Sequence, residues 1–92
     1  MLNYIGHTHG TAEEIIEALE RNNVNVEEAQ NSEGERMHMF LCLNELVYFM
    51  PDAKTGRCIF YSAINFNLSP NGMALRMQIG KSIPSISGNW DN

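Results

Sequence analysis

The chain has 92 residues, 43% of them hydrophobic and 18% charged, and a net charge of −5 at pH 7. This length supports one hydrophobic core, so we expect a single domain over residues 1–92, and the ordinary apolar content argues against a disordered protein. Only six residues are basic and they form no run, which argues against direct non-specific binding to nucleic acid. The apolar stretches are far shorter than the ~20 residues of a membrane-spanning helix, so no membrane association is expected.

The cellular compartment is inferred from the first residues and the cysteines. Residues 1–6 have neither a basic start nor a long apolar segment, so we expect no secretory signal and a cytoplasmic protein. Cys42 and Cys58 each lie inside an apolar run. Because an isolated cysteine behaves as a small buried hydrophobe, we favour two buried free thiols over a disulfide.

One amphipathic helix is predicted near the start of the chain. Thr11 stands three residues before Glu14, the capping-box spacing in which each side chain satisfies the backbone N–H of the other residue. Apolar residues follow at helical spacing, at Ala12, Ile15, Ile16 and Leu19. The pattern predicts about three turns, ending near Asn22 and Asn23.

The middle of the chain allows two interpretations. Residues 24–26 alternate like a short strand, and residues 27–36 lack periodicity, which indicates an exposed connection. Residues 36–50 could form a helix, because residues 32–35 resemble a second capping box and Pro51 could end it. They also alternate in hydrophobicity and are rich in strand formers, so we favour two strands.

The second half of the chain is read as mostly strand. Residues 51–56 carry turn residues and predict a hairpin loop leading into a β-rich segment over residues 57–67. A second turn is predicted at residues 69–72, followed by a half-buried strand over residues 73–79. Residues 81–92 are interpreted as a flexible C-terminal tail. The expected fold is α+β, an antiparallel β-meander of three to five strands with one main amphipathic helix packed on a face.

A glycine-bearing loop before the helix is one candidate site. It comprises Gly6, His7, Thr8, His9, Gly10 and Thr11. Such a loop can offer backbone N–H groups and the positive end of the helix dipole to an anion. It matches no nucleotide-binding fingerprint, and the alternative is an ordinary turn into a capped helix.

The sequence gives less support for a metal site or for catalysis. His7, His9 and His38 do not complete the ligand set of a zinc site, so we expect no metal and no other cofactor. A hydrolase using His7 or His9 as a general base is a further hypothesis, but no partner residue can be named for it. Neither a nucleophile motif nor a catalytic set is present, which favours a protein that is not an enzyme.

Acidic residues on the helix form the second candidate site. Glu13, Glu17 and Glu20 share the side opposite the apolar residues, and could steer the protein toward a basic partner. Trp90 could anchor the same interface. The alternatives are a solvated helix face with a Glu17–Arg21 pair and a tryptophan docked on the core.

These observations favour a small non-enzymatic binding protein that acts by protein–protein contact. Its expected partner is a protein with a basic patch, and the small acidic chain is typical of inhibitors and adaptors such as phage accessory proteins. The alternative is a protein that binds or sequesters a small anion or nucleotide through residues 6–11. The residues predict no particular oligomeric state.

Overall fold

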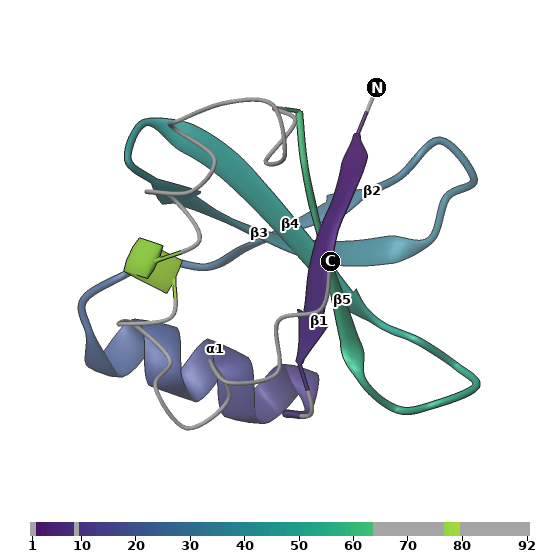
Figure 1. Ribbon diagram of the computed structural model, residues 1–92, viewed down its shortest axis with the longest axis horizontal. Helices are drawn as coiled ribbons and strands as arrows, with labels where there is room; N and C mark the ends of the chain where they lie inside the picture. Colours follow the sequence, from purple (N-terminus) through teal and green to yellow (C-terminus); the bar gives the residue numbers. More distant parts are fainter. Residues whose placement is uncertain (1, 9, 64–76, 80–92) are drawn as a thin grey trace.

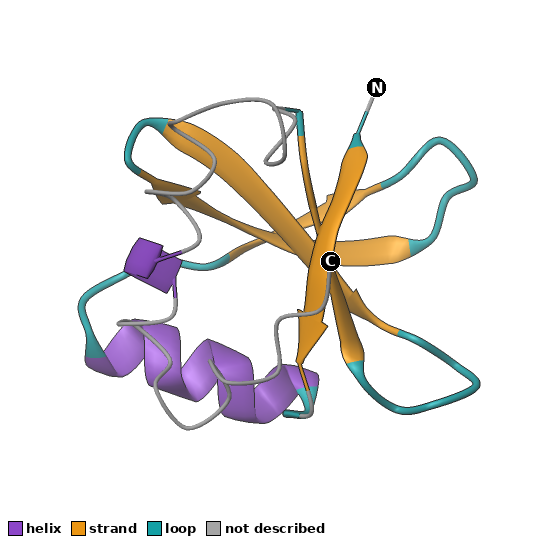
Figure 2. Cartoon of the chain, viewed as in Figure 1, coloured by secondary structure: helices purple, strands orange, loops and turns teal. Residues whose placement is uncertain are grey.

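The fold combines an antiparallel sheet with a helix (Figures 1 and 2). The computed structural model describes residues 2–8, 10–63 and 77–79. In chain order its elements are β1 (Asn3–Thr8), α1 (Ala12–Arg21), β2 (Glu27–Gln30), β3 (Arg36–Cys42), β4 (Glu45–Pro51) and β5 (Cys58–Ser62). The α+β class predicted from the sequence is confirmed at this level.

The sheet has five strands in the order β1-β5-β4-β3-β2, and every neighbouring pair is antiparallel. Strands β2 to β5 pair consecutively along the chain. Strand β1 comes first in the chain but lies at the opposite edge from β2, beside β5. The connection through α1 therefore runs from one edge of the sheet to the other (Figure 1).

Helix α1 begins and ends as predicted. The Thr11 hydroxyl accepts a hydrogen bond from the Glu14 backbone N–H at 3.2 Å, and the Glu14 carboxylate accepts one from the Thr11 N–H at 3.0 Å. These bonds, the one from the Thr11 backbone first, lower the pKa of Glu14 because they favour its charged form. At the other end Asn22 is the C-cap and Asn23 has a φ of 65°, the left-handed conformation common after a helix.

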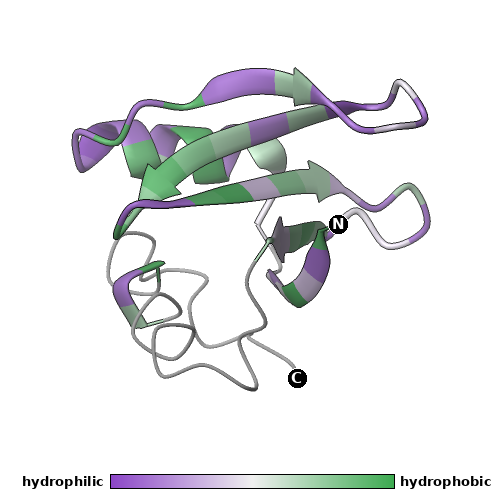
Figure 3. Ribbon diagram, turned by 90° about the horizontal axis from the view of Figure 1, so that it is seen from above, coloured by the Kyte–Doolittle hydropathy of each residue, from purple (hydrophilic) through white to green (hydrophobic). Residues whose placement is uncertain are grey.

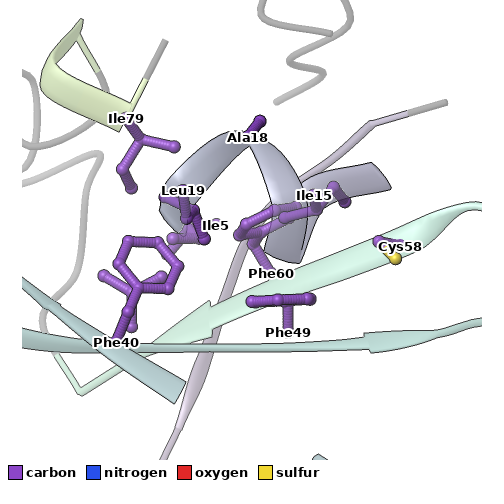
Figure 4. Packing of buried hydrophobic residues seen from close by; sticks show 10 residues of the cluster. Ile5, Ile15, Ala18, Leu19, Phe40, Phe49, Cys58, Phe60 and Ile79 are labelled. Carbon is purple, nitrogen blue, oxygen red and sulfur yellow. The ribbon is translucent and has the colours of Figure 1, made fainter. Parts of the chain in front are cut away.

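The core lies between α1 and one face of the sheet, which we call the inner face. Its centre is a row of buried phenylalanines, Phe40, Phe49 and Phe60, on three adjacent strands. The rings of Phe49 and Phe60 stack with centroids 5.3 Å apart. Ile15 and Leu19 point from α1 toward these rings (Figure 4). Burial of these large side chains is the main favourable contribution to folding.

Strand β2 replaces the connection predicted at residues 27–36, and that prediction is wrong for Glu27–Gln30. Residues 24–26, read as a strand, are not in one. The hydrophilic character of β2 is visible in Figure 3. As an edge strand, β2 is held by backbone pairing to β3, while most of its side chains remain in solvent. Such a strand needs no apolar alternation, which explains why the pattern failed.

Residues 36–50 form two strands, as favoured from the sequence. Strands β3 and β4 meet at a two-residue turn, where Leu43 and Asn44 have φ of 49° and 65°. Positive φ at both positions is the geometry of the tight hairpin turn that matches the twist of a sheet. The hairpin predicted at residues 51–56 is also present, with the Asp52 N–H bonded to the Arg57 carbonyl at 2.7 Å.

The predicted strand over residues 73–79 is wrong where it can be compared. Met77 and Ile79 are in helical conformation, with Met77 62% exposed and Ile79 fully buried. Two residues in a helix differ by about 200°, so they face opposite sides, whereas a strand would place them on one face. Residues 73–76, the turn at 69–72 and the tail at 81–92 lie outside the described residues, as does the β-rich segment from residue 64 onward.

Thr8 gives a stability prediction, because its buried hydroxyl has no hydrogen-bond partner among the residues that the structure describes. A buried unsatisfied polar atom costs about 1–3 kcal/mol, so the isosteric change Thr8→Val should raise the free energy of unfolding by about 1 kcal/mol. Ser62→Ala is the matched control, since the buried Ser62 hydroxyl donates to the Leu46 carbonyl at 3.3 Å, and its loss should cost about 1 kcal/mol. Urea unfolding measures both. Equal destabilisation by the two changes would contradict the prediction.

Candidate functional site

The predicted anion loop at residues 6–11 is shorter than expected. Gly6, His7 and Thr8 belong to β1, where they pair with β5, so the loop prediction is wrong for these three residues. Their backbone belongs to an edge strand that is hydrogen-bonded to β5. Gly10 is buried and Thr11 caps α1, while His9 lies outside the described residues. The helix N-terminus already holds the Glu14 carboxylate.

His7 lies in a hydrogen-bonded group that the sequence did not suggest. Its Nε2 is 2.7 Å from a guanidinium nitrogen of Arg57, and its Nδ1 is 2.7 Å from the Tyr4 hydroxyl. Because arginine can only donate, Nε2 accepts, and Nδ1 carries the hydrogen donated to the tyrosine oxygen. Both ring nitrogens are therefore engaged by neighbouring side chains. Arg57 is distant in sequence, and only the pairing of β1 with β5 brings it near.

The acidic residues of α1 are exposed, as predicted. Glu13, Glu17 and Glu20 all lie in solvent, and the Glu17 carboxylate is 3.1 Å from the Arg21 guanidinium, the pairing expected from the sequence. Trp90 lies outside the described residues, so its role in an interface stays a prediction.

The two cysteines are free, and Cys58 is buried while Cys42 is half-buried. Burial raises the pKa of the Cys42 thiol. Burial first, and the charge of Glu13 second, raise the pKa of Cys58 to about 11. Both groups are thus poor nucleophiles near neutral pH.

The face of the sheet turned away from α1, which we call the outer face, carries a second group of large side chains. The pleat places Tyr48 and Met50 of β4 opposite in direction to the buried Phe49, and Ile59 and Tyr61 of β5 opposite to Phe60. The register between β4 and β5 places Tyr48 beside Tyr61 and Met50 beside Ile59. These side chains are half-buried, so their apolar surface is available for contact.

Two loops turn this part of the outer face into a hollow of about 780 Å³. Both the loop between β2 and β3 and the loop between β4 and β5 extend from the same end of the sheet (Figures 1 and 3). We call this region the outer-face hollow. Its floor is apolar and aromatic, with Met37, Tyr48, Met50, Ile59 and Tyr61; its rim carries the charged residues Glu33, Glu35, Asp52 and Lys54.

The tyrosines extend beyond the hollow as a row across three strands. Tyr4 of β1 pairs with Tyr61 of β5, which pairs with Tyr48 of β4. The rings of Tyr4 and Tyr61 meet edge to face, with centroids 6.5 Å apart. Aligned aromatic rings on an accessible sheet face offer flat apolar surface and a negative π face to a ligand.

The rim gives the hollow a negative potential. Burial first, then the charges of Asp52 and Glu35, raise the pKa of Tyr61 because they disfavour its phenolate. The rim loops are held by local hydrogen bonds, with the Asn31 side chain accepting from the backbone N–H groups of Glu33 and Glu35, both at 2.9 Å. The Glu35 carboxylate accepts from the Asn31 side-chain amide at 2.9 Å, and the Asp52 carboxylate accepts from a backbone N–H of its own loop at 3.0 Å, so both are oriented by local hydrogen bonds. A cation is the ligand charge that this site favours.

A further apolar surface lies at the opposite end of the outer face. Leu41, Leu43 and Leu46 are 57%, 55% and 45% exposed, and we call them the leucine patch. Leu41 and Leu46 are cross-strand neighbours, and Leu43 occupies the hairpin turn. Among the described residues, the groove of about 420 Å³ that Leu41 and Leu46 line has one acidic residue, Glu27, against the three that border the outer-face hollow.

Comparisons with known proteins give no relative for this chain: no protein-family model, no characterised protein and no solved structure matches it. Within residues 2–8, 10–63 and 77–79, no helix is long and apolar enough to cross a membrane. The same residues contain no group of three or more His, Cys, Asp or Glu side chains placed to hold a metal ion.

The electrostatics of the hollow can be tested through Tyr61. Asp52→Asn and Glu35→Gln should each lower the pKa of Tyr61, because each removes a negative charge that disfavours its phenolate. Glu17→Gln on α1 is the control and should leave the Tyr61 titration unchanged. The measurement is a pH titration of tyrosine ring-carbon chemical shifts, which resolves the individual tyrosines. A Tyr61 pKa that is the same in all four proteins would show that the rim charges do not act on this side chain.

Proposed function

We propose that this protein is a non-enzymatic binding protein that acts by contact with a basic surface of a partner protein, as an inhibitor or adaptor does. The observation that carries the proposal is the outer-face hollow, where an aromatic floor lies beside the carboxylates of Glu33, Glu35 and Asp52. Protein interfaces draw most of their affinity from aromatic and arginine side chains at the centre of a contact. Complementary charge around that centre adds association rate and specificity.

The hollow supports this function better than the helix site predicted from the sequence. Both surfaces are acidic, but the face of α1 that bears Glu13, Glu17 and Glu20 offers only solvated charges, one of them already paired with Arg21. Exposed charge pairs contribute little affinity. The hollow combines an aromatic and apolar floor with a charged rim, which is the arrangement of an apolar centre and a polar border that protein interfaces have.

The alternative, binding of a small anion or nucleotide at residues 6–11, has less support in the geometry. The capping box occupies the Thr11 and Glu14 backbone N–H groups, and both ring nitrogens of His7 are engaged. The alternative predicts that nucleotides stabilise the protein against heat and that replacing His7 and His9 by alanine removes this effect. Our proposal predicts no such stabilisation.

A charge-reversal pair of variants separates the two acidic surfaces. Glu33→Lys with Glu35→Lys alters the hollow, and Glu17→Lys with Glu20→Lys alters α1; both change the net charge by the same amount. With a partner isolated from the source cells, the hollow variant should associate about tenfold more slowly at low salt, because electrostatic steering would be lost. The α1 variant should associate nearly as fast as the unaltered protein. Stopped-flow measurements over a salt series give these rates.

The outcomes distinguish the hypotheses. Slower association of the α1 variant alone would assign the interface to the helix face instead of the hollow. Equal rates for all three proteins would contradict a charge-guided contact at either surface. Circular dichroism and thermal unfolding of both variants confirm that folding is retained, which is expected because all four glutamates are exposed.

A further inference from the structure

We infer that the outer-face hollow binds an arginine side chain carried by an exposed segment of the partner protein. This inference rests on the proposed function and adds the identity of the recognised side chain. It depends on three features of the hollow: the adjacent tyrosines, the apolar residues beside them and the carboxylates of the rim. Each feature matches one part of an arginine side chain.

The apolar part of the floor fits the aliphatic stem. Met50 and Ile59 are cross-strand neighbours next to the Tyr48–Tyr61 pair, and Met37 lies at the base of the same hollow. Met37 is only 2% exposed but does not belong to the core cluster beneath α1. It is therefore packed on the outer side of the sheet, at the bottom of the hollow. Long basic side chains bury their methylene stems on such surfaces while the charged end stays near polar groups.

The tyrosines fit the charged end. Tyr48 and Tyr61 are direct neighbours on adjacent strands, and both rings border the hollow. A guanidinium is planar and weakly hydrated, so it stacks on an aromatic face more readily than a compact ammonium does. The floor therefore favours arginine over lysine at this position.

The rim supplies the counter-charge. Three carboxylates and one lysine border the hollow. The charges of Asp52 and Glu35 contribute to the raised pKa of Tyr61. A carboxylate accepts the paired N–H groups of a guanidinium, whereas a phosphate group would be repelled. This charge complementarity favours a basic protein segment over nucleic acid or a small anion.

Isotope-labelled protein and a short synthetic peptide test the assignment. The probe is acetyl-Gly-Leu-Arg-Leu-Gly-amide, and the control peptide carries citrulline, the neutral isostere of arginine, in place of arginine. The arginine peptide should shift the backbone signals of β4, β5 and the two rim loops. It should bind about tenfold more tightly than the citrulline peptide, because citrulline lacks the positive charge that the tyrosine rings and the carboxylates attract. A lysine peptide should have intermediate affinity.

Variants link the preference to particular side chains. Asp52→Asn combined with Glu35→Gln should lower the arginine-to-citrulline affinity ratio from about ten to about three, because the attraction to the carboxylates is lost while the cation–π contact with the tyrosine rings remains. Tyr61→Leu should weaken binding of the arginine peptide about fivefold, since it keeps an apolar group and removes the π face, whereas Tyr61→Phe should retain binding. Leu43→Asn in the leucine patch is the control and should change neither affinity.

Specific results would overturn the inference. Equal affinity for the arginine and citrulline peptides, or signal changes confined to the leucine patch, would contradict arginine recognition by the hollow. Chemical-shift changes that depend on protein concentration without peptide would instead assign the hollow to a second copy of this chain. If the isolated partner loses affinity for the Glu33→Lys, Glu35→Lys variant while the peptide preference is absent, the proposed protein contact stands and only the arginine assignment fails.

Discussion

The pairing of β1 with β5 is the constraint on which the rest of the structure depends. Strands β2 to β5 could form a meander through local hairpins alone, but β1 must join at the far edge, beside the strand most distant from it in the described sheet. This non-local pairing directs α1 back across the sheet and encloses the core. It also places Tyr4 against Tyr61 and His7 against Arg57, so the same contact completes the core and extends the outer aromatic row.

Two faces of one sheet carry aromatic residues for different reasons. On the inner face Phe40, Phe49 and Phe60 are nearly or fully buried beneath α1 and stabilise the fold. On the outer face the aromatic residues are tyrosines, which combine an apolar ring with a polar hydroxyl that tolerates water. An aromatic face of this kind costs less in solvent than a phenylalanine face would. A face of this kind therefore suits the contact surface that we propose.

The sequence was sufficient where local interactions decide structure. The capping box at Thr11 and Glu14 predicted the start of α1, because both partners lie within one helical turn. Alternation in residues 36–50 predicted β3 and β4, and it separated the side of Phe40 from that of Met37 and Met39. It failed for β2, whose Glu27–Gln30 are held by the backbone at a sheet edge, and for Met77 and Ile79, where alternation of apolar residues coincided with helical backbone. The pattern of apolar and polar side chains indicates which residues are buried. It does not indicate where backbone hydrogen bonds form at an exposed edge of a sheet.

By itself the sequence determined the composition of the candidate sites: an acidic chain, exposed glutamates on α1, and no catalytic or metal-binding motif among its residues. Only the tertiary structure decided which of these residues act together. Glu35, Tyr48, Asp52 and Tyr61 belong to two loops and two strands, and nothing in their spacing relates them. They meet because antiparallel registration aligns Tyr48 with Tyr61 and because alternate hairpin loops emerge at one end of the sheet. A surface formed by strand register has no local sequence signature, since each residue in it is fixed by the pairing of distant segments.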